Sequence, residues 1–259
     1  MNIVVLVKQV PDTWAERRLD SADNTLDRAS VDVVMNEIDE YAVEEALRIK
    51  EAQGGEVTVL MMAAERGAET IRKALSMGAD KAVHLSDEAL HGSDAIQTSY
   101  ALSKVLSTLD YDLVLCGSEA TDSRMAIMAP LLAERLGQPQ LSGARKVEVS
   151  AGTVRIERQT EHGYDLVEAS APAIVSVVEK INEPRYPSFK GIMAAKKKPL
   201  TTLTLADAEI DAARVGLASA PSKVIEFANK PPRQAGQVVA DEGDGGDKVA
   251  AFLVSQKFI

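Results

Sequence analysis

Aliphatic residues in the first half of the chain occur in short runs, and a longer amphipathic stretch follows each run. Uninterrupted aliphatic runs are typical of strands buried on both faces, whereas apolar residues three or four positions apart are typical of covering helices. The expected strands are residues 3–10, 57–62, 81–85 and 113–116, and the expected helices are residues 40–51, 69–77, 93–109 and 123–136. This alternation predicts a parallel sheet with right-handed crossovers.

The pattern changes in the second half of the chain. Four short strands are expected without helices between them, at residues 145–149, 153–159, 164–169 and 174–178. Ala151-Gly152 and His162-Gly163 are pairs typical of hairpin turns. We expect these strands to form an antiparallel extension of the same sheet.

Three prolines, Pro184, Pro187 and Pro199, mark a change of composition after residue 181. Together with the basic run 196–198 they predict a loop. Beyond residue 200 the periodicity is weak, and an extended tail ending in a short helix near residues 247–254 is expected. The chain therefore divides into residues 1–181, 182–200 and 201–259.

Composition and charge narrow the class of protein. Hydrophobic residues make up 46% of the chain and charged residues 26%, which is ordinary for a globular core. The net charge of −10 disfavours nucleic acid and anionic membranes as partners. A single cysteine, Cys116, excludes an intramolecular disulfide and fits a reducing, cytoplasmic location. We expect no signal peptide, and no apolar run approaches the ~20 residues of a membrane span.

A ligand site is expected outside the carboxyl ends of the parallel strands, where the strand order reverses. The loops that would line it are residues 8–13, 62–66 and 117–124. Neither the glycine fingerprint of dinucleotide-binding folds nor a P-loop occurs in the sequence. The strongest remaining candidate is the segment 117–123, where Gly117 permits close backbone approach and the next helix could hold a phosphate at its N-terminus.

A plainer interpretation exists for each part of this candidate site. The segment 117–123 can also be interpreted as a plain strand-to-helix turn capped by Asp122 or Ser123. On spacing alone this plainer interpretation is favoured. Asn36 is either a helix cap followed by acids that suit the helix dipole, or a residue lining a nucleotide pocket. For Asn36 too, the residues by themselves favour the plainer interpretation.

Catalytic and metal-binding patterns are not found in the sequence. His84, His91 and His162 lack ligand spacing, and no nucleophile-elbow motif occurs. Cys116 ends an aliphatic run and is interpreted as a buried small hydrophobe. We therefore expect a binding function, with no catalytic residue and no metal.

The segment 182–198 combines aromatic, aliphatic and basic residues between prolines. In an otherwise acidic chain, such a local basic and apolar projection indicates a docking device. The alternative is a solvated charge run beside a buried edge.

Four segments resemble the beta subunit of electron transfer flavoproteins: residues 5–12, 35–47, 69–80 and 182–198. The last is similar to the family's recognition loop, and the signature pattern maps onto residues 156–176 through Arg158, Glu161, Gly163, Val167 and Pro172. His162 and Asp165 depart from that signature inside a hairpin. Near the nucleotide loop, Met125 and Ile127 replace the hydroxyl and amide side chains of many relatives, Glu37 replaces a proline, and Ser123 and Arg124 are the candidate substitutes.

The resemblance implies a fold, cofactors and partners. The implied fold is α/β: a Rossmann-like parallel sheet with helices on both faces, of the adenine nucleotide alpha hydrolase-like type, extended by antiparallel strands and a C-terminal arm on the alpha-type subunit. FAD would be held mostly by the alpha subunit, and this chain would hold AMP, with a second FAD as the alternative. The implied partners are the alpha subunit, acyl-CoA dehydrogenases and a membrane quinone oxidoreductase.

The resemblance also assigns residues by position. The implied AMP contacts are Leu6, Asn36, Asp39, Met62, Gly117, Ala120, Asp122, Ser123 and Arg124, flanked by Val7 and Lys8. The residues implied near the flavin are Val10, Pro11, Asp12 and Thr13. The implied docking residues are Arg185, Tyr186, Phe189, Ile192, Met193 and Lys197, with Phe189 aligned to an anchoring leucine of animal members.

Two other classes share this kind of core. A free-standing nucleotide-binding regulator of the universal-stress type would be a homodimer without flavin, and the docking loop and long tail argue against it. An ATP-cleaving enzyme of the same fold is disfavoured because the sequence has no Ser-Gly-Gly phosphate loop.

Overall fold

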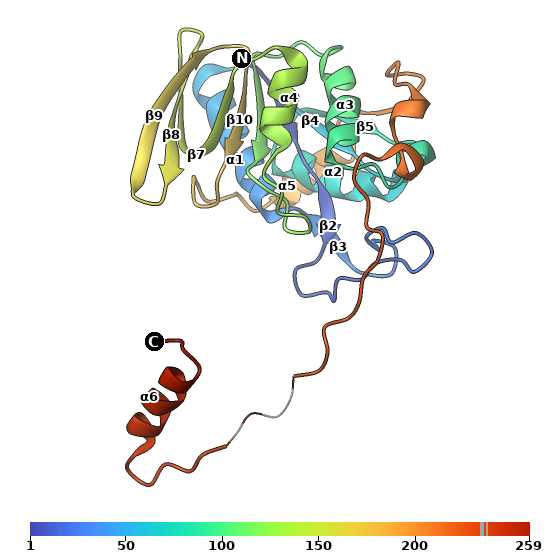
Figure 1. The fold of residues 1–259 in the computed structure, drawn as a ribbon. Coiled ribbons are helices and arrows are strands. Elements are labelled where there is room, and N and C mark those ends of the chain that lie inside the picture. The colour runs from blue at the N-terminus through green and yellow to red at the C-terminus, as the bar shows by residue number, and fades with distance from the viewer. Residues whose placement is uncertain (234–235, 237) are drawn as a thin grey trace. The chain divides into compact units, whose positions relative to one another are not determined.

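The strand–helix alternation builds one large sheet in the computed structural model, which describes all residues except 234, 235 and 237. The chain divides into two units, Met1–Ile225 and Glu226–Ile259, which are described separately. The sheet of the first unit has nine strands in the order β11-β5-β4-β1-β6-β10-β7-β8-β9 (Figure 1). Their bounds are β1 Asn2–Leu6, β4 Glu56–Met62, β5 Lys81–Leu85, β6 Leu113–Gly117, β7 Gln140–Ser150, β8 Thr153–Thr160, β9 Gly163–Ser170, β10 Ala173–Val177 and β11 Leu200–Leu203.

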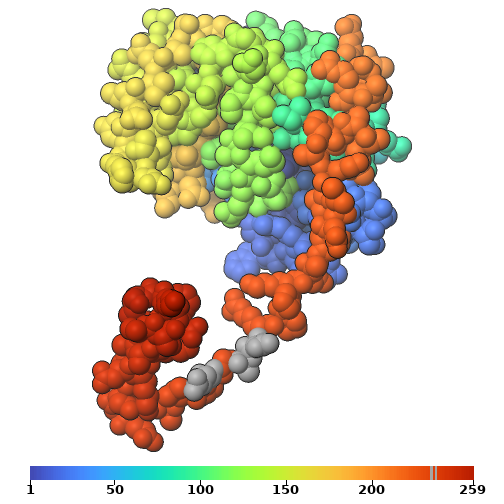
Figure 2. All heavy atoms as spheres, viewed as in Figure 1, coloured from blue at the N-terminus to red at the C-terminus, as the bar shows by residue number. Residues whose placement is uncertain are grey.

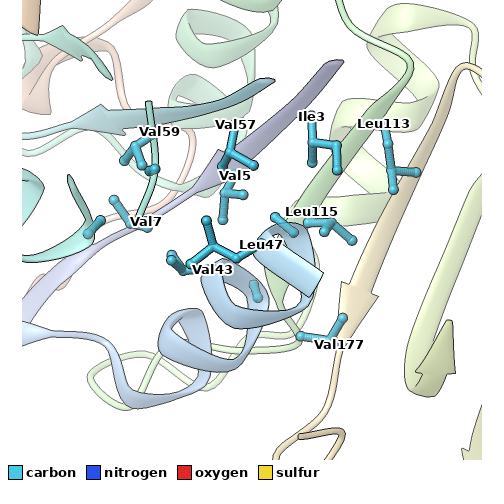
Figure 3. Close-up of a cluster of buried hydrophobic side chains, with 14 of the residues drawn as sticks. Ile3, Val5, Val7, Val43, Leu47, Val57, Val59, Leu113, Leu115 and Val177 are labelled. Atoms are coloured by element: carbon cyan, nitrogen blue, oxygen red, sulfur yellow. The ribbon is translucent and has the colours of Figure 1, made fainter. Parts of the chain in front are cut away.

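Helices cover both faces of the sheet, as expected for an α/β fold (Figure 1). Alternate residues of β1 face opposite layers: Val5 packs with the core under α1 and α2, and Val4 packs with the core under α3 and α4. Figure 3 shows Val5, Val43 and Leu47 meeting in the first of these cores. The helices are α1 Glu37–Gln53, α2 Ala68–Met77, α3 Ala95–Leu106 and α4 Met128–Leu136.

The strand at residues 174–178 was expected to be antiparallel, and this expectation is wrong. β10 lies between β6 and β7 and runs parallel to both. All five of its residues are buried, as in a central strand covered on both faces. Only β8 and β9 form the antiparallel extension, beyond β7.

The expected first strand, residues 3–10, is two strands. β1 ends at Leu6, and β2 (Gln9–Pro11) leaves the main sheet to pair with β3 (Val33–Met35). The aliphatic run continues through both because both are buried. The segment between β2 and β3, residues 12–32, is called the N-terminal flap below.

The helix expected at residues 123–136 begins only at Met128. Arg124 and Ala126 adopt positive φ angles of 49° and 54°, which interrupt any right-handed helix. Residues 118–127 are therefore a loop, and the expectation that a helix starts directly after the segment 117–123 is corrected.

The segment expected as a loop, residues 182–200, contains a short helix, α5 (Phe189–Ala195). Ser188 caps it by accepting a hydrogen bond from the Gly191 N–H at 3.0 Å. Gly191 lies against α2, where a Cβ would stand 2.5 Å from the Ser76 carbonyl oxygen. Only glycine allows this close contact.

Residues 200–225 belong to the first unit rather than to a tail. β11 adds a parallel strand beside β5. The C-terminal strap, residues 204–225, buries Leu205, Ala208, Ile210 and Val215 against the α3 side of the core. Figure 2 shows the blue flap and the orange strap side by side, where the Asn24 amide donates to the carbonyl oxygens of Val224 and Ile225.

The second unit carries one helix, α6 (Gly245–Ser255), close to the expected residues 247–254. None of the described residues of this unit is buried. Residues 234, 235 and 237 of the expected C-terminal extension lie outside the described residues. Along the described part of the chain, no helix combines the length and apolar character needed to cross a membrane.

Candidate functional site

The strand order reverses between β1 and β6. From β1 the chain continues outward through β4 and β5, whereas β6 lies on the other side of β1 and leads to β10 and β7. In open α/β sheets the loops that leave the carboxyl ends of two such strands diverge, and ligands bind between them. The region between the loops after β1 and β6 is called the crevice below. Leu6 and Gly117 end these two strands, and the first and third expected loops contact each other through Lys8 and Asp122.

Asp39, in the first turn of α1, ties the two loops together. Its carboxylate accepts the backbone N–H of Lys8 at 2.8 Å and that of Gly117 at 3.1 Å. Burial raises the pKa of Asp39 to about 7, while the hydrogen bonds from Asn36, Lys8 and Gly117 act in the opposite direction. A Cβ on Gly117 would lie 2.5 Å from Asp39 Oδ1, so glycine is required for this contact.

Asn36 occupies the N-cap position of α1 without making a side-chain cap. Its amide instead donates to the Glu119 carbonyl oxygen at 2.9 Å and accepts the Thr121 N–H at 3.0 Å. Asn36 therefore stands at the expected N-cap position, followed by acidic residues in the first turn, but its side chain holds the loop after β6 instead of capping the helix. Among the described residues, Thr121 Oγ1 is buried without a hydrogen-bond partner.

Asp122 is the charged centre of the crevice. Its side chain is 1% exposed and its oxygens bind Lys8 Nζ at 2.7 Å and Arg28 Nη2 at 2.8 Å. Burial by itself would raise the pKa of Asp122, but the two cations hold it below its ordinary value. Sequence reasoning missed Arg28, which lies in the N-terminal flap and carries no motif or periodicity.

The crevice differs from the expected phosphate site in one respect. Because α4 starts at Met128, the segment 117–123 is followed by a loop and not by a helix N-terminus. The backbone N–H groups of Ser123 and Arg124 both donate hydrogen bonds to the Ala120 carbonyl oxygen. Cations and an unpaired hydroxyl are thus the groups available for an anion here, and they fit a phosphate.

The other expected nucleotide residues surround this centre to different extents. Leu6 and Val7 are buried in the core, Met62 and Ala120 are partly buried, and Ser123 and Arg124 are exposed. Arg124 lies 3.8 Å from Glu119.

The expected flavin-proximal residues lie at the end of β2 and at the start of the N-terminal flap. Val10 and Pro11 are buried in β2, Asp12 is partly buried and Thr13 is exposed. The next residue, Trp14, is 96% exposed and was not singled out from the sequence. In the sequence, a lone tryptophan within a polar and charged stretch was the feature that could have indicated this exposed aromatic side chain.

The docking segment, residues 182–198, is fastened to α1 and α2 by arginines on both sides of the contact. Arg185 binds Glu44 at 2.7 Å and Glu51 at 2.5 Å, and these contacts raise its pKa further. Arg72 donates to the Ala195 and Lys198 carbonyl oxygens. Arg185 was expected to face a partner, but its described contacts are within the chain.

The apolar side chains of the docking segment point away from the chain's own core. Tyr186 is 96% exposed and Phe189 is 81% exposed, and Ile192, Met193 and Lys197 are exposed beside them. The fastened backbone therefore presents a small apolar patch with nearby lysines. Such patches on a rigid base are typical of protein interaction sites.

Replacing Arg185 with methionine should lower the free energy of unfolding by about 2–3 kcal/mol. Glu44, whose side chain is 7% exposed, would lose its cationic partner and keep only the hydrogen bond from the backbone N–H of residue 185. Chemical denaturation would measure the change. Arg48→Met is the matched control, because Arg48 lies 3.9 Å from Glu45 and is largely exposed. Equal stability of the two variants would contradict the prediction.

Comparison with known proteins decides the family. Residues 23–208 match the electron transfer flavoprotein domain. The chain is 54% identical to electron transfer flavoprotein subunit beta of Mycobacterium leprae, over 100% of this chain and 99% of that one. The chain belongs to the electron transfer flavoprotein family, as a beta subunit.

Other members of the electron transfer flavoprotein family show how far the similarity extends. Identity to the beta subunit of Thermoanaerobacterium thermosaccharolyticum is 42% over 92% of both chains. It is 34% to the caffeyl-CoA reductase-Etf complex subunit CarD of Acetobacterium woodii, over 99% of this chain and 97% of that one. Membership in this family places the chain in electron transport with a flavin and implies an alpha-type partner subunit.

Proposed function

We propose that this beta subunit forms the fixed base of a heterodimer that carries electrons from acyl-CoA-type dehydrogenases to a membrane quinone reductase. FAD, held mostly by the alpha subunit, supplies the redox chemistry when bound. This chain contributes a nucleotide crevice between β1 and β6, and it offers the docking segment to the dehydrogenase. The observation that carries the proposal is the exposed apolar patch on a fastened segment, in a chain of this family.

The way the docking segment is held supports separate roles for this chain, which would bind the dehydrogenase, and for the alpha subunit, which would carry the flavin. Hydrogen bonds and ion pairs fix residues 182–198 to α1 and α2, so little conformational freedom is lost when a partner binds the patch. A partner that recognises only Phe189 and its neighbours leaves the flavin-bearing part of the alpha subunit free to move. One docking surface could thus serve several dehydrogenases.

We further propose that the crevice of this chain holds AMP rather than a second FAD. A pyrophosphate carries more charge than a single phosphate and needs more donors. Met125 and Ile127, in the loop after β6, provide none. Lys8, Arg28 and the Thr121 hydroxyl are enough for one phosphate group.

The test is the nucleotide content of the heterodimer produced with its alpha subunit. After denaturation, mass spectrometry should find one FAD and one AMP per heterodimer. Two FAD molecules per heterodimer would overturn the AMP assignment. An AMP-containing beta chain that forms a flavin-free homodimer would overturn the proposed function as a whole.

A further inference from the structure

Three segments that are distant in sequence meet at one buried carboxylate. Lys8 follows β1, Asp122 follows β6, and Arg28 comes from the N-terminal flap, 94 positions before Asp122. Each Asp122 oxygen takes one cation, with Lys8 Nζ on Oδ1 and Arg28 Nη2 on Oδ2. The carboxylate therefore fixes the direction of both cations.

The cluster has more positive charge and more donors than Asp122 can use. Two cations face one carboxylate, which leaves one net positive charge. Lys8 and Arg28 are 38% and 39% exposed, so their outer sides remain accessible. Within the described residues, the side chains of Lys8 and Arg28 make no hydrogen bond other than the one to Asp122. An ammonium has three donors and a guanidinium five, so most of them are unused.

A second observation points to the same place. Thr121, the residue before Asp122, has a buried hydroxyl with no partner among the described residues. Buried polar atoms are normally satisfied, and one left over in the residue next to Asp122 indicates a missing polar ligand. A phosphate accepts hydrogen bonds from hydroxyl, ammonium and guanidinium groups alike.

We propose that Arg28 and Lys8, oriented by Asp122, bind the phosphate group of the nucleotide, and that Arg28 makes the N-terminal flap one wall of that site. The inference rests on the nucleotide crevice of the proposed function and adds a residue from outside its loops. It selects a nucleoside monophosphate, because a guanidinium and an ammonium on one carboxylate match a single phosphate.

The N-terminal flap is held by other contacts as well, so Arg28 can be replaced without detaching the flap. Asp23 pairs with His91 at 2.7 Å, and Asn24 donates to the C-terminal strap. Loss of the Arg28 side chain should leave the flap in place. A purely structural brace and a phosphate ligand can therefore be separated by experiment.

The experiment compares Arg28→Gln with the wild type as purified heterodimers. Nucleotide is removed, and AMP binding is measured by equilibrium dialysis with labelled AMP, alongside melting temperature and FAD content. We expect Arg28→Gln to raise the Kd for AMP by about 10- to 100-fold, the range for a lost hydrogen bond to a charged group. Arg28→Lys, which keeps the charge, should recover part of the affinity.

Arg18→Gln is the matched control, because Arg18 lies in the same flap, is exposed and pairs only with Glu16 among the described residues. It should bind AMP like the wild type. An unchanged Kd in Arg28→Gln, with a lowered melting temperature, would show a structural brace and overturn this inference alone. A wild-type heterodimer that binds no AMP would overturn the AMP assignment and this inference together.

Discussion

A chain that ends at Ile225 should fold but should no longer hold its alpha subunit. The described part of the unit Glu226–Ile259 has no buried residue. It carries exposed Val249, Phe252 and Val254 on α6, followed by exposed Phe258 and Ile259. Apolar side chains gathered in this way are stabilised by contact with another surface. We expect the truncated chain to elute as a monomer and the heterodimer to lose most of its flavin.

Sedimentation and flavin absorbance of the co-expressed pair would measure this loss. The melting temperature of the truncated chain alone should match that of the full chain, because its core lies within Met1–Ile225. A sharper variant is Phe252→Asp, which places a charge on the apolar surface of α6. Lys248→Asp is its control on the same helix, at a polar position paired with Asp244. A truncated chain that keeps a normal heterodimer and normal flavin would contradict the prediction.

Phe189→Ala should raise the apparent KM of the dehydrogenase for the flavoprotein by roughly 30- to 140-fold. Burial of a phenylalanine side chain at an interface is worth about 2–3 kcal/mol, and each 1.4 kcal/mol is a factor of ten. In this chain Phe189 is 81% exposed, so its loss leaves no cavity. The melting temperature, the flavin content and reduction by dithionite should stay as in the wild type.

A dehydrogenase-coupled assay, run with a melting curve on the same preparations, would test this. Leu166→Ala is a suitable control, because Leu166 is 67% exposed on the edge strand β9, far along the sheet from α5 (Figure 1). That control should leave both quantities unchanged. A normal KM in Phe189→Ala, or a melting temperature lowered as far as a core mutation would lower it, would rule out the docking role.

The patterns that could be read from the sequence are local ones. β5 matches its expected bounds, and β4 and β6 differ from theirs by a single residue, because a buried strand shows as an aliphatic run wherever it lies in the fold. The start of α3 at Ala95 lies close to its expected start at residue 93, where Asp94 caps the helix, since a cap depends on residues a few positions apart. The family resemblance also rests on such contiguous segments, and the comparisons confirm it.

The patterns that failed were those in which distant residues decide. A five-residue buried strand reads alike whether it pairs parallel or antiparallel, so β10 was misplaced until its neighbours β6 and β7 were known. The late start of α4 depends on positive φ angles at Arg124 and Ala126. Arginine and alanine rarely adopt such angles, so the sequence gives no sign of them.

The sequence by itself determined the fold class, the family and the segment that carries the exposed apolar patch, because periodicity and contiguous motifs are properties of neighbouring residues. Only the tertiary structure decided which charges pair. Arg28 meets Asp122 across 94 positions, and Arg185 meets Glu44 across 141. An ion pair needs two side chains within about 4 Å. That proximity comes from the order of the strands in the sheet and from the packing of α1 and α2. Neither can be predicted from a single stretch of sequence, because both bring together residues that are distant along the chain.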